Sequence, residues 1–217
     1  MTDRHPFLQP EWIAPERTAL VLIDMQVDFG ASDGEMAKRG ADVKPAQAAV
    51  VKAEALAEAA RGAGVSVLFV RLLNHPGGEN RIAREAKARH GKDEPDLCVE
   101  GTHGAEFIGP QPMPCEAVIS KTQFSAFART GLAEQLHAQT IDTLVLAGLT
   151  TECCVASSAW DAFERDFHIF IASDACAAYE DSLHDGALRA LKLSGAILAK
   201  TGEYQSAWKK ISEYTST

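Results

Sequence analysis

Short apolar segments rich in valine, isoleucine and leucine recur along the chain, and they constrain its fold more than any other feature. None of them alternates apolar and polar residues, which is typical of strands that are buried on both faces of a parallel sheet. These segments are residues 19–24, 65–71, 117–121, 143–148, 168–173 and 196–200. Each is short enough for a strand and too short for a membrane span.

Helical patterns occupy the connections between these segments. They cover residues 45–63, 132–139, 154–165, 182–193 and 204–214, and a shorter solvated helix is expected at 81–89. Strands and helices that alternate in this way predict an α/β fold with a parallel sheet, right-handed crossovers and helices on both faces. A length of 217 residues suits one domain of this architecture, residues 1–217.

Composition excludes several classes of protein. Hydrophobic residues make up 46% and charged residues 24% of the chain, as in soluble globular proteins. The net charge of −9 forms no long block of either sign, so we expect no nucleic-acid partner. No membrane span or signal pattern is found, which favours a cytoplasmic location. The cysteines are odd in number and lack CxxC spacing, so we expect free thiols: Cys98, Cys115, Cys153, Cys154 and Cys176.

Residues 74–111 break the alternation of strands and helices. This stretch follows a predicted strand and is rich in glycine, proline and mixed charge. Connections of this length in a domain usually act as lids or binding loops. We therefore predict that residues 74–111 form an active-site loop.

Three reactive side chains stand at predicted strand ends, where parallel sheets bind their ligands. Asp24 ends the first strand, Lys121 ends the third, and the fourth runs into a turn that carries Cys153 and Cys154. Each has an ordinary structural explanation alone, but their coincidence favours an active site. A helix end and a lysine would lower the pKa of a thiol, a carboxylate would accept its proton, and N–H groups of the turn would bind an oxyanion.

The same segments carry a family resemblance. The motifs ALVLIDMQVDF, ISKTQFSAF and GLTTECCVASSAWDAFERDF occur in the order seen in isochorismatase-like cysteine hydrolases, and GTHGAEF and SDACAA look like further family features. The chain resembles the amidohydrolase branch of this family over about residues 17–200. The resemblance implies a doubly wound, six-stranded parallel sheet in a three-layer, Rossmann-like arrangement.

The resemblance also implies roles for single residues. It assigns a catalytic triad to Asp24, Lys121 and Cys154, with a cis peptide bond between Leu149 and Thr150. The N–H groups of Thr150 and Cys154 would then form the oxyanion hole. Cys153, the neighbour of the nucleophile, would turn toward packing.

Substrate binding is assigned to Phe29, Asn74 and Phe127. Phe29 resembles an aromatic wall for a planar substrate. Nicotinamidases of the family hold a metal with an Asp-x-His pair after the second strand, and here only Asn74 and His75 stand in that place. A site built from His75, His90 and His103 is an alternative, but we predict no metal and no cofactor.

These features predict a hydrolase that cleaves an amide, ureido or carbamoyl C–N bond of a small molecule through a thioester. One alternative is an isochorismatase-type vinyl ether hydrolase that uses Asp24 and Lys121. Another is a redox-sensing protein that uses Cys153 and Cys154. The resemblance implies a homo-oligomer, a dimer or tetramer, and the C-terminal segment around Trp208 is a candidate for the subunit contact.

Overall fold

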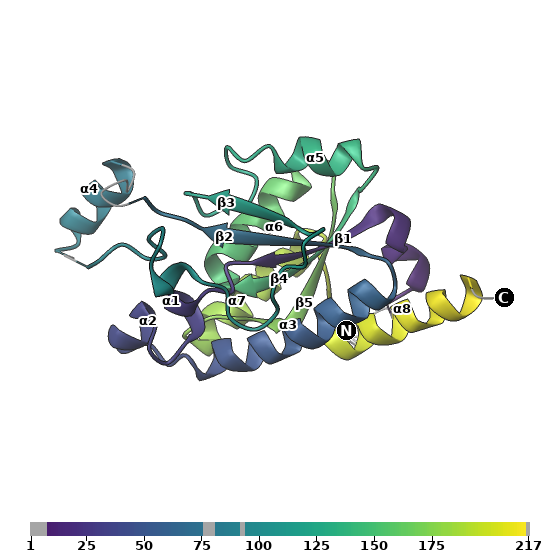
Figure 1. Cartoon of the computed structure of the whole chain (residues 1–217), viewed down its shortest axis with the longest axis horizontal. Helices are drawn as coiled ribbons and strands as arrows, with labels where there is room; N and C mark the ends of the chain where they lie inside the picture. Colours follow the sequence, from purple (N-terminus) through teal and green to yellow (C-terminus); the bar gives the residue numbers. More distant parts are fainter. Residues whose placement is uncertain (1–7, 76–80, 92–93, 216–217) are drawn as a thin grey trace.

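The computed structural model describes residues 8–75, 81–91 and 94–215 and shows a parallel sheet between two layers of helices (Figure 1). The sheet has 6 strands in the order β3-β2-β1-β4-β5-β6, and every neighbouring pair is parallel. The strands are β1 (Thr18–Ile23), β2 (Ser66–Leu72), β3 (Ala117–Lys121), β4 (Thr143–Leu149), β5 (His168–Ala177) and β6 (Ile197–Ala199). The predicted doubly wound α/β fold is confirmed.

One face of the sheet is covered by α3 (Lys44–Gly62) and α8 (Thr201–Thr215), which run side by side (Figure 1). The buried stripe of α3 consists mostly of alanine, and its members recur at spacings of three and four residues, as on one face of a helix. Such small side chains let the helix backbone lie close to the strands. The stripe is Ala46, Ala49, Val50, Ala53, Leu56, Ala57 and Ala60.

The opposite face is covered by α5 (Leu132–Ala138), α6 (Ala156–Phe163) and α7 (Asp181–Leu193). The shorter helices α1 (Val27–Gly30), α2 (Glu35–Lys38) and α4 (Arg81–Arg89) lie beyond the carboxyl ends of the strands (Figure 1). Residues 76–80 and 92–93 of the predicted active-site loop lie outside the described residues. The three short helices therefore lie together at the carboxyl ends of the strands.

Within the C-terminal segment considered for a subunit contact, the side chain of Trp208 lies in the core. Its side chain is only 1% exposed, its ring packs on Tyr204, and its indole N–H donates to the carbonyl of Ile13. A tryptophan with this burial and a satisfied N–H belongs to the core. Any subunit contact made by this segment would therefore use its other side chains.

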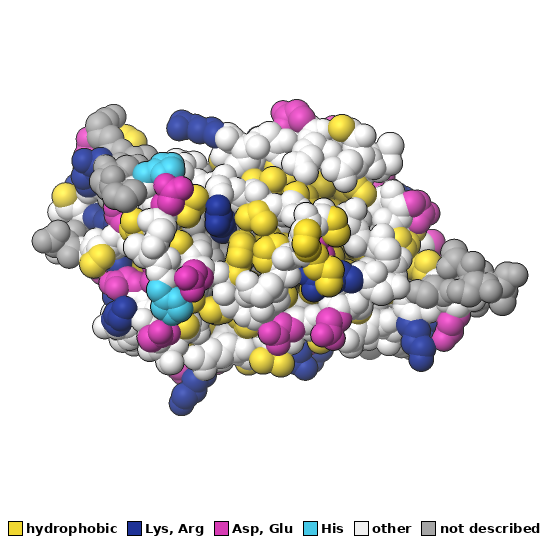
Figure 2. Space-filling view, in the orientation of Figure 1, with side chains coloured by type: hydrophobic (Ala, Val, Ile, Leu, Met, Phe, Trp, Pro, Cys, Tyr) yellow, Lys and Arg dark blue, Asp and Glu magenta, His cyan; other side chains and the backbone are white. Residues whose placement is uncertain are grey.

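Apolar side chains nevertheless reach the surface. Figure 2 shows hydrophobic side chains gathered at the centre of the displayed face, with charged side chains both scattered around them and along the outline. On α6 and α7 the exposed large apolar side chains are Trp160, Phe163, Leu183 and Leu193, the last 90% exposed. Within the described ranges, no helix combines the length and the hydrophobicity that crossing a bilayer requires.

Gly148, near the end of β4, sits where the first and second halves of the sheet meet. Its φ is +143°, and a Cβ there would overlap the carbonyl oxygen of Ile23, its register partner on β1. Gly148→Ala is expected to lower the free energy of unfolding by roughly 2–3 kcal/mol, because both the backbone conformation and the strand spacing resist a side chain. Chemical denaturation would measure the loss.

Gly186→Ala is the matched control for this substitution. Gly186 lies within α7, and a Cβ there would meet nothing within 4 Å. Alanine is the better helix former, so this variant is expected to be as stable as the parent or about 1 kcal/mol more stable. Equal stability of the two variants would contradict a tight approach of β1 and β4 at Gly148.

Candidate active site

The reactive side chains lie at the switch point of the sheet. The chain runs from β1 outward to β2 and β3 and then returns to the other side of β1 with β4, so the strand order reverses between β1 and β4. Crevices at such reversals, outside the carboxyl ends of the strands, are where α/β proteins bind ligands. Asp24 follows β1 directly, and Cys154 lies in the turn after β4.

Lys121 reaches this point from the edge of the sheet. It ends β3 in register with Leu72 of β2, two strand positions from β1. Neighbouring strands are about 4.8 Å apart, so a side chain from β3 must cross the end of β2 to reach β1. Only a long side chain such as lysine can span that distance and meet Asp24.

Asp24 and Lys121 form a buried ion pair. The Nζ of Lys121 lies 2.7 Å from Oδ2 of Asp24, and both side chains have 0% exposure. Burial raises the pKa of Asp24, although the Lys121 ammonium opposes that rise. Burial acts to lower the pKa of Lys121, but the charges of Asp24 and Cys154 outweigh it and the pKa is raised. The lysine is therefore charged, and the carboxylate holds a proton more readily than an exposed one would.

The thiol of Cys154 completes the cluster. Its Sγ lies 3.4 Å from Nζ of Lys121, which also donates to the carbonyl of Gln123 at 2.9 Å. A hydrogen bond with Cys153, burial and the Asp24 carboxylate together raise the pKa of the Cys154 thiol. The expectation of a lowered pKa was wrong for this arrangement, because the charge of Lys121 is shared with Asp24 and the thiol is buried. The resting thiol therefore needs a base.

The chain turns sharply between β4 and the thiol. The peptide bond between Leu149 and Thr150 is cis, and residues Thr151–Val155 form one π-helical turn before α6 begins. The carbonyl of Thr150 accepts the N–H groups of Cys153 and Val155, each at 3.2 Å. Thr150 itself stays buried, and its hydroxyl donates to Oε1 of Glu152. The turn thus packs the nucleophile candidate and Glu152 around Thr150.

The three residues assigned to substrate binding make different contacts in the structure. Phe29 is buried in α1, and its carbonyl accepts the hydroxyl of Tyr179. Asn74 donates its side-chain amide to the carbonyl of Leu97, so it holds the loop in place. Phe127 does not fit the role, because its ring packs on Phe167. Phe167 precedes β5 and so lies at the amino ends of the strands, whereas the thiol lies at their carboxyl ends.

Gln26 and Asp28, in the motif ALVLIDMQVDF, have no role predicted from the sequence, but both organise the site. The amide of Gln26 donates to the carbonyls of Leu72 and Ala105 and accepts the N–H of Leu72. It extends the pairing of β2 beside Asp24 and ties the loop to it. The periodicity of the sequence carries no sign of this, because one glutamine joins segments distant along the chain.

Asp28 anchors the later part of the loop, around Cys98. Its carboxylate accepts the N–H of Cys98 at 2.7 Å and that of Glu35 at 3.1 Å. A Cβ on Gly104 would collide with the same carboxylate, so only glycine fits there. The GTHG stretch is thus explained by a close approach of the backbone to Asp28.

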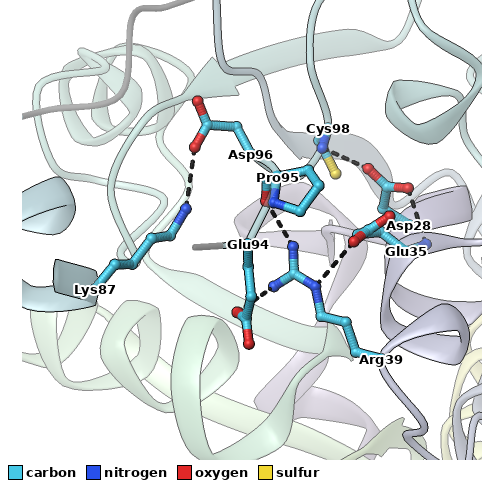
Figure 3. A network of polar contacts seen from close by, with 8 residues as sticks. All are labelled: Asp28, Glu35, Arg39, Lys87, Glu94, Pro95, Asp96 and Cys98. Carbon is cyan, nitrogen blue, oxygen red and sulfur yellow. Dashed lines mark hydrogen bonds and ion pairs between the residues drawn. The ribbon is translucent and has the colours of Figure 1, made fainter. Parts of the chain in front are cut away.

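Arg39 fixes the same stretch from α2 (Figure 3). Its guanidinium contacts the carboxylates of Glu35 and Glu94 and the carbonyl of Pro95. Lys87 of α4 pairs with Asp96 in this network. The described part of the loop is therefore held against α1 and α2, with Cys98 beneath it. Burial raises the pKa of the Cys98 thiol, the carboxylates of Asp28 and Asp24 add to that rise, and the Lys121 ammonium opposes it.

The histidines considered for a metal site are engaged separately. His75 contacts Glu100 at 2.8 Å, and His103 contacts Glu106 at 2.8 Å and Asp33 at 3.3 Å. Throughout residues 8–75, 81–91 and 94–215, no group of three or more His, Cys, Asp or Glu side chains is arranged to hold a metal ion. The structure offers no geometry for the alternative built from His75, His90 and His103.

Fold and site together define an α/β protein with a buried carboxylate, ammonium and thiol at the switch point of its sheet. Residues 18–203 match the family model described as the isochorismatase domain. The chain belongs to the isochorismatase family, as its motifs predicted.

Known relatives give the match more detail. The chain is 28% identical over 179 residues to the ureidoacrylate amidohydrolase RutB of Agrobacterium fabrum, covering 77% of this chain and 78% of that protein. An isochorismatase family protein from Desulfovibrio vulgaris has a TM-score of 0.75 at 30% identity, covering 86% of this chain and 95% of that one. An N-carbamoylsarcosine amidase from Thermoplasma acidophilum has a TM-score of 0.69 at 28% identity, covering 85% and 96%.

Proposed function

We propose that this protein is a cysteine amidohydrolase that cleaves an amide, ureido or carbamoyl C–N bond of a small molecule through a thioester of Cys154. The observation that carries the proposal is the position of the Lys121 ammonium, 2.7 Å from Asp24 and 3.4 Å from the Cys154 sulfur. The predicted class of reaction, C–N bond hydrolysis by a cysteine hydrolase, is confirmed by the relatives named as amidohydrolases and amidases. The triad roles and the thioester are the proposal.

The first half of the reaction forms the acyl enzyme. Asp24 accepts the proton of the Cys154 thiol, and the sulfur forms a bond to the substrate carbonyl carbon. The carbonyl oxygen becomes an oxyanion in the turn, bound by the N–H groups of Thr150 and Cys154. Occupation of the neighbouring N–H groups of Cys153 and Val155 by the Thr150 carbonyl supports this choice. The C–N bond then breaks, and Asp24 returns the proton to the departing nitrogen.

The second half releases the acid. Water attacks the thioester carbon and gives a proton to Asp24, a C–O bond forms, and the C–S bond breaks. The thiolate that leaves takes its proton back from Asp24. Lys121 keeps its charge throughout and stabilises whichever of Asp24 and Cys154 is negative. One donor of an oxyanion hole is typically worth ~2.7–4 kcal/mol, so the turn would contribute as much as a single member of the triad.

The rate is expected to depend on pH through Asp24. The base must be ionised to take the thiol proton, and burial raises its pKa above the usual 3.8. Activity should therefore fall as pH drops through this raised pKa, with the acidic limb of kcat/KM lying above 3.8. A pH profile would measure it, with circular dichroism over the same range as a check on folding. Constant activity down to pH ~4 would contradict a buried aspartate base.

A screen for ammonia release tests the function directly. Small carboxamides, ureas and carbamoyl acids are incubated with the enzyme, and ammonia is measured together with the intact mass of the protein. We expect release with at least one ureido or carbamoyl compound and a transient acyl adduct on the peptide that contains Cys154. Turnover of a vinyl ether with no ammonia from any amide would contradict the proposal and favour the ether hydrolase.

The setting of the enzyme is part of the proposal. We infer a cytoplasmic enzyme, because the chain has five free cysteines and its nucleophile requires a reducing compartment. The exposed apolar side chains on α6 and α7 support a homo-oligomer, a dimer or tetramer. Residues 1–217 would form one catalytic domain, with residues 74–111 as its active-site loop.

A further inference from the structure

Glu152 has a buried carboxylate oxygen that no described residue contacts by a hydrogen bond. Oε1 of its carboxylate accepts the hydroxyl of Thr150 at 2.9 Å. Oε2 is buried and has no hydrogen-bond partner among the described residues. A buried acceptor that remains unpaired is unfavourable by about 1–3 kcal/mol, and more when it is charged. Such an atom two residues before a nucleophile points to a donor that arrives with the substrate.

The surroundings of Glu152 belong to the reactive centre. Burial raises the pKa of the Tyr179 hydroxyl, and the Glu152 carboxylate and the thiols of Cys98 and Cys154 add to that rise. Tyr179 donates its hydroxyl to the carbonyl of Phe29. Glu152, Tyr179 and Phe29 therefore lie near the thiol, on the side formed by α1 and the turn after β4.

The charge of this region is negative once its internal pairs are counted. Lys121 is paired with Asp24 at 2.7 Å. Arg39, which also acts on Tyr179, is held by Glu35 and Glu94. Both cations are thus already matched by carboxylates, while Oε2 of Glu152 has no donor in the part of the chain that the structure describes. A substrate carboxylate placed beside Glu152 would meet a like charge, whereas an N–H group would meet an acceptor.

We propose that Oε2 of Glu152 accepts a hydrogen bond from an N–H group of the substrate, so that the enzyme selects neutral or cationic ureido compounds over ureido acids. The inference rests on the proposed amidohydrolase function and narrows its substrate class. A ureido group fits because it carries N–H donors on both sides of its carbonyl. With the carbonyl oxygen in the turn at Thr150, one N–H group is free to face Glu152. The relatives named ureidoacrylate amidohydrolase take an acid by their printed name, so this chain would differ from them in charge preference.

Three ureido compounds of similar size test the proposal: ureidopropionate, its methyl ester, and aminoethylurea. They carry a negative, a neutral and a positive end group on the same ureido unit. The values of kcat/KM for ammonia release are expected to be at least about 10-fold higher for the ester and the amine than for the acid, because all three offer the same N–H group and only the acid brings a like charge beside Glu152. A preference for ureidopropionate would overturn the charge selection and leave the amidohydrolase function standing.

Glu152→Gln isolates the contribution of the side chain. The amide keeps one oxygen for the Thr150 hydroxyl and replaces the other with an N–H₂ group, which repels a substrate donor. We expect kcat/KM to fall about 10- to 150-fold for the methyl ester, because its ureido N–H group loses the acceptor. The fall should be smaller for ureidopropionate, because the acid loses the same hydrogen bond but is also relieved of a like charge. Glu164→Gln, an exposed glutamate at the end of α6, is the matched control and should change neither. An equal loss for all three compounds would show that the charge of Glu152 sets no preference among end groups, and the proposed selection would be wrong.

A binding measurement keeps the test independent of turnover. Each compound is asked to protect Cys154 from alkylation by iodoacetamide, followed by mass spectrometry. Protection by the ester and the amine at lower concentration than the acid supports the selection even if no ammonia is released, in which case only the proposed function fails. Equal protection by all three, or none, overturns the inference. The wild-type comparison also stands if Glu152→Gln does not fold.

Discussion

Cys154→Ala is expected to abolish ammonia release, with kcat falling by at least ~10⁴-fold. Loss of the nucleophile leaves only binding and the oxyanion donors, which do not replace covalent catalysis. The fold should persist, because the side chain becomes smaller at a position where it is already buried among the core residues. Steady-state assays on the substrate found in the ammonia screen, together with intact mass, would measure the loss of both turnover and acyl adduct.

Cys153→Ala is the matched control, since it removes the adjacent thiol in the same turn. Cys153 is only half-buried, and its sulfur has no contact with Lys121 like the 3.4 Å contact of Cys154 among the described hydrogen bonds. We expect this variant to keep turnover within about tenfold of the parent. Retained hydrolysis in Cys154→Ala would support the ether hydrolase, which needs only Asp24 and Lys121. Equal loss in both variants, with a reversible disulfide in the parent, would support the redox switch.

Lys121→Met is expected to be the most destabilising substitution in the site and to inactivate the enzyme. It would leave the Asp24 carboxylate buried at 0% exposure with no opposite charge, and removing one partner of a buried pair typically costs about 3–5 kcal/mol. The variant should also lose the cation that stabilises the thiolate. Denaturant melts would give the free energy of unfolding, and the ammonia assay would give the activity.

The double variant Asp24→Asn with Lys121→Met separates the two effects. With both charges gone, most of the lost stability should return, because no unpaired ion remains in the core. Asparagine also tolerates the left-handed conformation of residue 24, whose φ is 52°. Activity should stay absent, since the base is missing. A Lys121→Met protein within about 1 kcal/mol of the parent would show that the two side chains do not form a charged pair.

Most of the framework could be predicted from the apolar pattern. The predicted segment 117–121 is β3 without change, and α3 differs from its predicted range by one residue at each end. Strand β5 was the exception, because it runs on past 173 to Ala177. A register shift between Leu146 and Gly148 lets β4 pair with Cys176 and Ala177. A local pattern does not reveal such an irregularity, because it depends on the neighbouring strand.

The site was predictable in its members and less so in its electrostatics. Asp24, Lys121 and Cys154 are brought together because the carboxyl ends of parallel strands all lie on the same side of the sheet. Phe127 was misassigned because its position after β3 does not tell which way its ring turns. The pKa of Cys154 was expected to fall because a helix end and a cation were considered without burial. Tyr179 carried no signal at all, since its hydroxyl meets Phe29 from a distant part of the chain.

The sequence itself determined the order of the buried strands along the chain and the strand ends at which the reactive residues lie. Both depend on hydrophobic periodicity, which is a pattern among near neighbours along the chain. The tertiary structure alone decided which atoms meet there. Burial and Coulomb interactions depend on distances in space. Only folding sets the 2.7 Å between Lys121 and Asp24, or leaves one oxygen of Glu152 with no donor among the residues that the structure describes.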